Sequence, residues 1–446
     1  MRIVLVSTYE LGRQPFGLAS PTAWLRAEGH EVTQVDVSRS PLPTPAVAQA
    51  GLIAFFLPMH TATRLFLRLV GRIREVNPRA HLSAYGLYAP LNDVVLRHAG
   101  VETVIGGEFE QPLVDLANRL SGVDPAAAAP HLNISLGRQQ FLVPDRAGLP
   151  PLASYAQLAT GGTTRRVGYT EASRGCKHLC RHCPVVPVYN GVFRVVRPDV
   201  VLEDIRRQVA AGAQHITFGD PDFFNGPTHA MRIVEALHGE FSSLTYDVTI
   251  KVEHLLRHRD LLRCLKDTGC AFVTSAVESF DDAVLRILAK GHTRADFLQA
   301  LDLMRAAGLP LAPTFIPFTP WTTLDSYRAF LRTLAGLDLV EQVAPVQLAI
   351  RLLIPAGSLL FELPEVRSIL QPFDDTGLCY PWRAKDNAVD GLHAAVQDLI
   401  QKEERRRAAR SEIFRQIWDL SGCGDFPEMA LAARATIPYL TEPWYC

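Results

Sequence analysis

The sequence lacks the features that mark membrane, secreted and nucleic-acid-binding proteins. No apolar run approaches the roughly 18–20 residues that a membrane helix needs. The apolar opening segment ends at Ser7, too early for the core of a signal peptide. Charge of one sign is not in excess either, since 45 basic residues face 46 acidic ones and the formal net charge is −1. We therefore expect a cytoplasmic protein that binds neither nucleic acid nor a membrane.

Cysteine is scarce for a chain of this length, with eight among 446 residues. A chain long enough for about three domains builds its own apolar core and does not depend on a disulfide scaffold. Three of the eight cysteines lie close together, between Cys176 and Cys183. This spacing indicates a metal centre in a reducing compartment.

The first 121 residues alternate short apolar runs with helical patterns. Strands are expected at residues 3–6, 32–37, 51–57, 80–85 and 104–107. Repeated units of this kind form a parallel sheet that is covered by helices and binds ligands at the carboxyl ends of its strands. We therefore expect a Rossmann-like domain over residues 1–121.

The rest of the chain divides into three parts. Residues 122–165 are rich in Ala, Pro, Gly and Thr and are interpreted as a linker on the surface. Residues 166–356 form a second series, with strands expected at 166–170, 215–218, 246–250, 272–276, 311–315 and 346–352. Six such units fit a partial (β/α)6 barrel better than a full eight-fold one. Residues 357–446 are expected to be a mainly helical cap that includes one charged helix over 392–418. The fold class is α/β.

The strongest motif follows the first strand of the second series, where Cys176, Cys180 and Cys183 have the spacing C-x3-C-x2-C. A structural zinc site takes four ligands, commonly as two separated pairs. A [4Fe–4S] cluster also takes four, so three thiolates leave one iron open for a substrate or cosubstrate. A zinc site with His178 or His182 as fourth ligand is the alternative. We rank it below the cluster because both histidines lie inside a very tight loop.

This loop resembles that of the radical S-adenosylmethionine (SAM) superfamily, and the resemblance extends over residues 166–355. It implies that the three cysteines hold a [4Fe–4S] cluster whose open iron chelates the amino and carboxylate groups of SAM. It also implies that one electron, from a flavodoxin- or ferredoxin-type donor, cleaves a carbon–sulfur bond of SAM. One departure is His182, where the family usually has an aromatic residue; an imidazole can shield the cluster in the same way.

The resemblance implies further contacts with SAM. Gly219, Asp220 and Pro221 stand where the family has a Gly-Gly-Glu-Pro-like turn, with Asp220 as the acceptor for the SAM amino group. Glu278 is the candidate for the ribose hydroxyls, because a carboxylate accepts two hydroxyl donors. The candidates for the SAM carboxylate or the substrate are Lys251 and Arg351. For each of these charged residues, a salt bridge at the barrel rim is the alternative.

The amino-terminal region resembles the cobalamin-binding domain that precedes the barrel in one radical SAM subgroup. The matching pieces are residues 15–19, 29–32, 106–110 and 143–150. The Asp-x-His-x-x-Gly motif that supplies a lower cobalt ligand in many cobalamin proteins is absent, and His60 is interpreted as a rim residue. Two alternatives stay open: cobalamin bound without a protein ligand, or a domain that has kept only the fold.

The last residues, 437–446, resemble the end of radical SAM proteins with a carboxyl-terminal Cys-Cys-Ala-Glu-Pro or Cys-selenocysteine-Ala-Glu-Pro tail. This chain stops after Cys446, and we expect a truncation at a codon that the native host reads as selenocysteine. Related tail-bearing proteins act in arsinothricin biosynthesis and move the 3-amino-3-carboxypropyl group of SAM onto arsenic. Soft thiol or selenol ligands suit trivalent arsenic, so Cys446 and Cys423 are candidate catalytic residues.

These observations favour a radical SAM enzyme that transfers a SAM-derived carbon group to a small molecule or metalloid. The specific hypothesis is transfer of 3-amino-3-carboxypropyl to trivalent arsenic. The alternative enzyme is a cobalamin-dependent radical SAM methyltransferase acting on an unactivated carbon or phosphorus. An alternative of another class is a non-catalytic iron–sulfur protein that senses a metal or metalloid.

Overall fold

The computed structural model describes residues 1–122, 134–427 and 439–441. Its amino-terminal part is a parallel sheet with the strand order β2-β1-β3-β4-β5-β6. The strands are β1 (Arg2–Ser7), β2 (Glu31–Asp36), β3 (Leu52–Phe56), β4 (His81–Tyr85), β5 (Thr103–Gly107) and β6 (Ile134–Ser135). All five expected strands form, and β6 is an addition at the edge.

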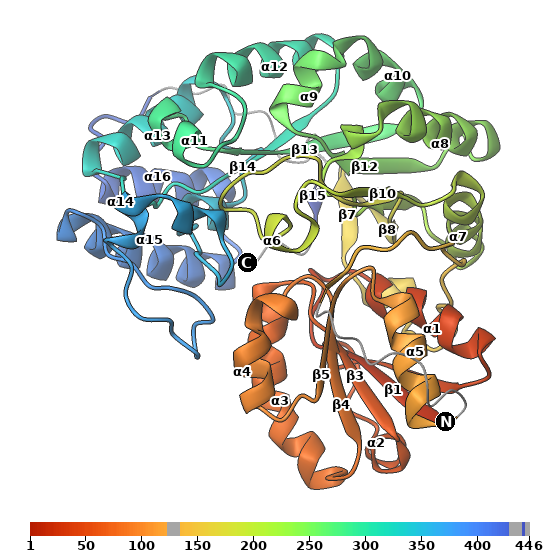
Figure 1. Cartoon of the computed structure of the whole chain (residues 1–446). Coiled ribbons are helices and arrows are strands. Elements are labelled where there is room, and N and C mark those ends of the chain that lie inside the picture. Colours follow the sequence, from red (N-terminus) through yellow and green to blue (C-terminus); the bar gives the residue numbers. More distant parts are fainter. Residues whose placement is uncertain (123–133, 428–438, 442–446) are drawn as a thin grey trace.

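Helices cover both faces of this first sheet (Figure 1). One face packs against α1 and α5, and the other against α2, α3 and α4. Strands β3 and β5 are buried along their whole length, which explains their uninterrupted apolar or small-residue sequences. The helices are α1 (Phe16–Ala27), α2 (Thr44–Gln49), α3 (His60–Val76), α4 (Asp93–His98) and α5 (Glu110–Leu120).

The second sheet has the strand order β14-β13-β12-β11-β8-β7-β15. Its strands are β7 (Gln157–Thr160), β8 (Thr163–Thr170), β11 (His215–Phe218), β12 (Thr245–Thr249), β13 (Cys270–Glu278), β14 (Leu311–Phe315) and β15 (Tyr439–Leu440). The five strands from β8 to β14 are parallel. The sheet curls into a half-barrel, and helices line its outer side (Figure 1). The α/β architecture expected from the sequence is confirmed.

The outer helices of the half-barrel follow the strands in alternation. They are α7 (Pro198–Ala210), α8 (Pro227–Glu240), α9 (Val252–Arg257), α10 (Leu262–Asp267), α11 (Asp282–Ile287), α12 (Arg294–Ala306) and α13 (Leu324–Gly336). A small hairpin of β9 (Ser173–Gly175) and β10 (Phe193–Val195), with α6 (Val186–Tyr189), stands at the carboxyl end of β8. The loop that carries the three cysteines lies within this hairpin.

The expected sixth strand, residues 346–352, does not form. A 3-10 turn (Pro345–Leu348) takes up its first half, and a single parallel bridge joins Phe318 to Arg351. Pro345 has no N–H to donate to a strand ladder and favours the start of a turn. The side-chain carbonyl of Gln347 accepts a hydrogen bond from the backbone N–H of Phe315 at 3.0 Å. A side chain therefore satisfies a β14 donor that a sixth strand would have used.

The segment expected to be a surface linker, residues 122–165, is more than a linker. Strand β6 extends the first sheet, and β7 pairs antiparallel with β8 of the second. Tyr155 is buried, and its hydroxyl donates a hydrogen bond to Asp36 at 2.9 Å. The surface prediction was wrong because short strands and single buried aromatic residues leave little periodicity in a Pro- and Gly-rich stretch.

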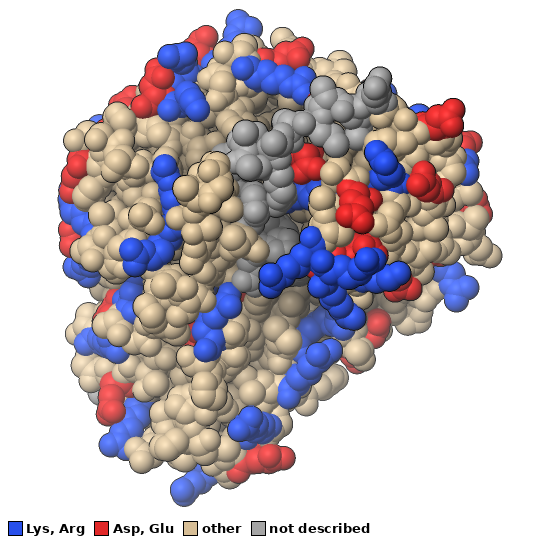
Figure 2. Space-filling view, turned by 180° about the vertical axis from the view of Figure 1, so that it is seen from behind, with Lys and Arg blue, Asp and Glu red and all other residues tan. Residues whose placement is uncertain are grey.

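The carboxyl-terminal part is mainly helical, with α14 (Pro364–Arg367), α15 (Asn387–Arg405) and α16 (Arg410–Leu420). The one charged helix expected over 392–418 is two helices, and the break includes Arg407 at φ 57°. Acidic and basic side chains both occur on the face shown in Figure 2, with a group of basic side chains near its middle. No described helix is long and apolar enough to cross a membrane.

Candidate functional site

Cys176, Cys180 and Cys183 lie together at the carboxyl end of the half-barrel. Cys180 is buried and the other two are half-buried. Burial raises the pKa of Cys183 to about 12, and the neighbouring thiols of Cys180 and Cys176 add to the rise. The three thiols are thus close enough to interact, and metal binding would release their protons. Three converging sulfur donors fit a [4Fe–4S] cluster with one open iron.

The two histidines of the loop do not join the cysteines. Nε2 of His178 faces Asp222 at 3.6 Å, and Nε2 of His182 lies 3.1 Å from Oε1 of Glu278. Each imidazole is thus directed at a carboxylate of the barrel. This arrangement does not support the zinc alternative, in which one of the two would complete a four-ligand site.

The cysteine loop is braced by the segment that follows β11. Oδ1 of Asn225 accepts a hydrogen bond from the backbone N–H of Lys177 at 3.3 Å and lies 4.0 Å from Sγ of Cys176. The backbone carbonyl of Asn225 accepts a second bond from Nζ of Lys177 at 2.6 Å. At the far side of the loop, the N–H of Arg181 donates to the carbonyl of Leu288 at 2.9 Å. The loop is therefore fixed to the barrel units of β11 and β13.

The turn expected to contact SAM, Gly219–Pro221, also supports the loop. Asp220 is buried and accepts hydrogen bonds from the hydroxyl of Ser173 and from the N–H of Ala172, the latter at 3.0 Å. Burial raises the pKa of Asp220 to about 7, although both hydrogen bonds act to lower it. A Cβ atom at Gly219 would overlap the hydroxyl of Tyr169. The role of Asp220 toward the SAM amino group stays a prediction.

Glu278 ends β13 and contacts the imidazole of His182 and the ammonium group of Lys290. It adopts a left-handed backbone conformation, with φ 68°. Its Oε1 lies 3.1 Å from Nε2 of His182 and 3.2 Å from Nζ of Lys290. Burial alone would raise the pKa of Glu278, but Lys290 and His182 hold it at about 2. Sequence reasoning did not find Lys290, a buried cation that interacts with Cys180 and Cys183.

Lys251 lies on the cluster side of the barrel. It is buried beside Cys176, and its Nζ is 3.8 Å from Oε2 of Glu253. His292 is a buried neighbour of Lys251, and neither of its ring nitrogens has a hydrogen-bond partner among the described residues. Orphaned buried polar atoms of this kind are satisfied when a polar ligand binds. The surroundings of the cluster loop therefore fit SAM as well as the cluster.

Arg351 forms a salt bridge. Its Nη1 is 2.7 Å from Oδ1 of Asp390, and its guanidinium stacks 3.7 Å from the ring centroid of Trp382. Both partners belong to the carboxyl-terminal part. The salt bridge considered as the alternative for Arg351 is the interaction that the structure shows.

Of the two candidate catalytic cysteines, only Cys423 lies among the described residues. Cys423 is buried beside α13 and α16, where its backbone N–H donates to Trp418 and its carbonyl accepts from Arg332 at 3.1 Å. Cys446 lies outside the described residues. The pairing of these two thiols stays a prediction.

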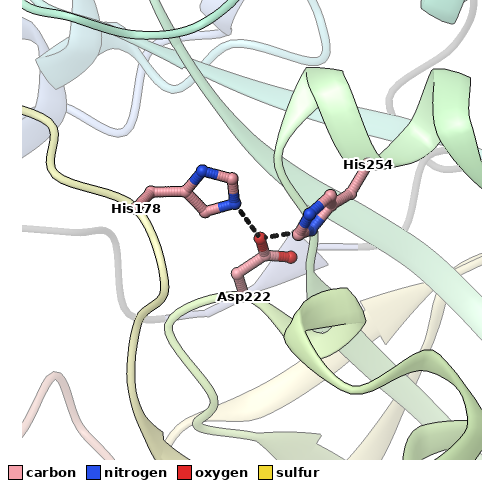
Figure 3. Close-up of side chains that lie close together, drawn as sticks. All are labelled: His178, Asp222 and His254. Carbon is pink, nitrogen blue, oxygen red and sulfur yellow. Dashed lines mark ion pairs between the residues drawn. The ribbon is translucent and has the colours of Figure 1, made fainter. Parts of the chain in front are cut away.

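A group that sequence reasoning missed joins His178 to Asp222 and His254 (Figure 3). Asp222 follows β11, and His254 lies in α9, which follows β12. Nδ1 of His254 is 2.7 Å from Oδ2 of Asp222. Consecutive parallel strands place their carboxyl ends at one edge of the sheet. The positions of these residues just after successive strands could therefore have predicted that they lie together.

The carboxyl edge of the first sheet faces the half-barrel (Figure 1). Glu108 and Glu110, at the end of β5 and the start of α5, bind Arg174 of β9 at 3.2 and 2.6 Å. His60 is the one described histidine at this edge, and its Nε2 is 2.6 Å from the carbonyl of Gly377. The described residues therefore do not fit a cobalamin whose lower ligand is a protein histidine, and we derive no step through that cofactor.

The half-barrel has sequence similarity to a known protein family and to curated proteins. Residues 170–334 match the radical SAM superfamily. The hopanoid C-3 methylase of Methylococcus capsulatus is 28% identical over 170 residues, which are 38% of this chain and 32% of the methylase. The tRNA-2-methylthio-N(6)-dimethylallyladenosine synthase of Geobacter sulfurreducens is 26% identical over 198 residues, 41% of each chain. The chain thus spans less than half the length of these relatives.

Solved structures resemble more of the chain. The cobalamin-dependent SAM radical enzyme OxsB, with aqua-cobalamin and SAM bound, has a TM-score of 0.71 at 15% identity. The similarity covers 94% of this chain and 70% of OxsB. The radical SAM methyltransferase TsrM of Kitasatospora setae has a TM-score of 0.58 at 18% identity, covering 76% of this chain and 70% of TsrM. Residues 170–334 therefore form a radical SAM domain, and the chain shares the fold of OxsB over 94% of its length.

Proposed function

We propose that the protein cleaves SAM reductively and transfers the 3-amino-3-carboxypropyl group of SAM to trivalent arsenic. The observation that carries the SAM chemistry is the loop of Cys176, Cys180 and Cys183, which is braced by Asn225, Asp220 and Glu278 through their contacts with neighbouring loop residues. When bound, the reduced cluster would supply the electron that breaks a carbon–sulfur bond of SAM and would take one electron back as the carbon group joins arsenic(III). SAM and arsenite would then give 5′-methylthioadenosine and an alkylated arsenic(V) acid with no net reductant consumed. The cysteines hold that cluster, and the half-barrel excludes water from it.

Residues of this chain prepare the site in two ways. Glu278 fixes the orientation of His182 beside the third cysteine, and Lys290 places a buried positive charge near the thiolates. That charge favours the thiolate form, which is the form that binds iron. His292 offers two unpartnered nitrogens, and Lys251 a cation, for the polar groups of SAM or of the second substrate.

The arsenic acceptor is supported by the resemblance of the tail around Cys446, which lies outside the described residues. Soft thiol ligands such as Cys446 suit a thiophilic element. Strand β15 pairs with β7, so residues 439–440 belong to the same sheet as the cluster strand β8. We also propose a cytoplasmic location, since reduced thiols and an iron–sulfur cluster suit a reducing compartment.

A second candidate is a cobalamin-dependent radical SAM methyltransferase. The observation that favours it is the similarity to OxsB over 94% of this chain, together with the resemblance to TsrM. In this candidate, cobalamin would bind at the carboxyl edge of the first sheet without a histidine ligand from the described residues.

Product analysis of SAM turnover separates the candidates. The anaerobically reconstituted protein is incubated with SAM, dithionite and arsenite, with and without cobalamin. Formation of 5′-methylthioadenosine together with an alkylated arsenic product supports the proposal. Formation of S-adenosylhomocysteine that depends on cobalamin overturns it in favour of the second candidate.

Two cysteine variants, one in the cluster loop and one outside it, test the assignment of the cluster site. Cys180→Ala takes away one ligand, and we expect loss of the bound iron, about four atoms per chain, and of all SAM-derived products. Cys264→Ala, a cysteine of α10 away from the loop, should keep both. Retained SAM cleavage in Cys180→Ala would contradict the assignment of the cluster site.

A further inference from the structure

A histidine, an aspartate and a second histidine converge beside the cluster loop. Nε2 of His178 and Nδ1 of His254 both point at Oδ2 of Asp222 (Figure 3). The three side chains are 17%, 0% and 6% exposed, in the order His178, Asp222 and His254. These three atoms lie within ion-pair distance but have no hydrogen-bond partner of acceptable geometry among the described residues, whereas Oδ1 of Asp222 accepts from the backbone N–H of Phe224 at 3.2 Å. Buried polar atoms in that state call for an explanation.

We propose that His178, Asp222 and His254 bind one divalent transition-metal ion of the zinc or ferrous class, separate from the iron–sulfur cluster. Two imidazole nitrogens and one carboxylate oxygen are the donors that such ions take, and three protein ligands leave a position open. The site does not depend on the reaction proposed above.

The distances suit one shared ion. Metal–nitrogen and metal–oxygen bonds of about 2.0–2.2 Å place two ligands of one tetrahedral ion about 3.3–3.6 Å apart. The carboxylate oxygen Oδ2 is 2.7 Å from Nδ1 of His254 and 3.6 Å from Nε2 of His178. One ligand atom of each residue lies within 4.8 Å of the other two, so side-chain rotations that move these atoms by about 1 Å bring all three to one ion.

The residues around the group provide the usual support for a metal-bound histidine. The second ring nitrogen of His178, Nδ1, faces Oε2 of Glu253 at 3.6 Å. Glu253 is itself held by Arg257, whose Nη2 is 2.7 Å from its Oε1. A carboxylate behind a ligating imidazole fixes the ring and raises its basicity. The ligands come from three separate segments, so the ion would tie the cluster loop to the ends of β11 and β12.

Zinc uptake by the cluster-loaded protein tests the site. With the [4Fe–4S] cluster in place, the three cysteines are occupied and cannot bind the added zinc. The protein is exposed to Zn²⁺, freed of unbound metal, and analysed for zinc and iron by mass spectrometry. We expect about one zinc per chain in the wild type, with the iron content unchanged. Absence of zinc from the wild type overturns the proposal.

Conservative variants locate the ion. His254→Gln and Asp222→Asn each remove one donor or its charge, and we expect zinc content to fall at least about tenfold. His98→Gln, an exposed histidine of α4, is the matched control and should keep the zinc. Unchanged iron content and cluster absorbance show that the variants fold. Equal zinc content in His254→Gln and the control overturns the assignment. Because no turnover is measured, the result is independent of the test of the proposed function.

Discussion

The carboxylate of Glu278 lies 3.1 Å from the imidazole of His182, so the end of β13 is tied to the residue that precedes the third cysteine. The family resemblance predicts Glu278 as a contact for the SAM ribose, whereas the structure shows it anchoring the loop. The two roles are compatible, because a carboxylate has two oxygens and both His182 and Lys290 contact Oε1.

Replacing Glu278 with glutamine should make the cluster less durable. The amide keeps the shape of the side chain but loses the charge that holds His182 and Lys290. Since supporting residues of this kind commonly contribute 10–100-fold to metal affinity, we expect cluster loss in the presence of a chelator to be about tenfold faster. The decay of the cluster absorbance measures it. Glu365→Gln, an exposed residue of α14, is the control, and equal decay rates in the two variants would contradict the prediction.

Gly219→Ala should destabilise the half-barrel through overpacking. The new methyl group would overlap the hydroxyl of the buried Tyr169, and strain of this kind typically costs about 1–3 kcal/mol. Urea unfolding measures the change in free energy of unfolding. Gly239→Ala is the matched control, because Gly239 lies in α8 and nothing is within 4 Å of the added carbon. That variant should be more stable by up to about 1 kcal/mol, and a loss in both variants would contradict the explanation.

The sequence predicted most of the fold and the grouping of the three cysteines, and the misses have physical causes. Local spacing defines the cysteine loop, and apolar runs define the parallel strands, so both were found. The segment 346–352 has a strand-like composition, yet Pro345 and the side chain of Gln347 replace the ladder. The contacts of His178 with Asp222 and of Glu278 with Lys290 are tertiary, and no local pattern encodes them.

Glu108 should contribute a fall in the stability of the protein as the pH rises from about 5 to about 8. Burial raises the pKa of Glu108 from 4.5 to about 7, although Arg174 acts in the opposite direction. The native state therefore binds a proton more tightly than the unfolded state between these values. This contribution is complete below pH 4.5 and is lost as the pH rises through about 7. The Glu108 contribution to the free energy of unfolding is at most about 3 kcal/mol.

Glu108→Gln is expected to remove this contribution because the amide does not titrate, so the stability of the variant relative to the wild type should rise between about pH 5 and about pH 8. The midpoints of urea unfolding at about pH 5 and about pH 8 measure the slope. Glu110 does not contribute to the change in stability between about pH 5 and about pH 8, because its pKa is lowered. Burial would raise the pKa of Glu110, but the charge and hydrogen bonds of Arg174 lower it by more. An unchanged slope in Glu108→Gln would assign the pH dependence to other groups.

Arg174→Met should be the most destabilising of these changes, because it leaves three carboxylates without their cation. The guanidinium lies 3.2 Å from Glu108, 2.6 Å from Glu110 and 2.7 Å from Glu171. Its side chain is 6% exposed, and those of Glu108 and Glu110 are 1% and 0% exposed. Removing one partner from a buried ion pair costs about 3–5 kcal/mol, since the remaining charge stays desolvated.

The control for Arg174→Met is Arg263→Met, whose ion pair with Asp267 has side chains that are 76% and 56% exposed. Exposed pairs contribute about 0–1 kcal/mol, so this variant should unfold at nearly the wild-type urea concentration. Adding Glu108→Gln and Glu110→Gln to Arg174→Met should restore part of the loss, because the uncompensated charges are then gone. A loss in Arg174→Met no larger than that of the control would show that the contact between the first sheet and the hairpin does not depend on this ion cluster.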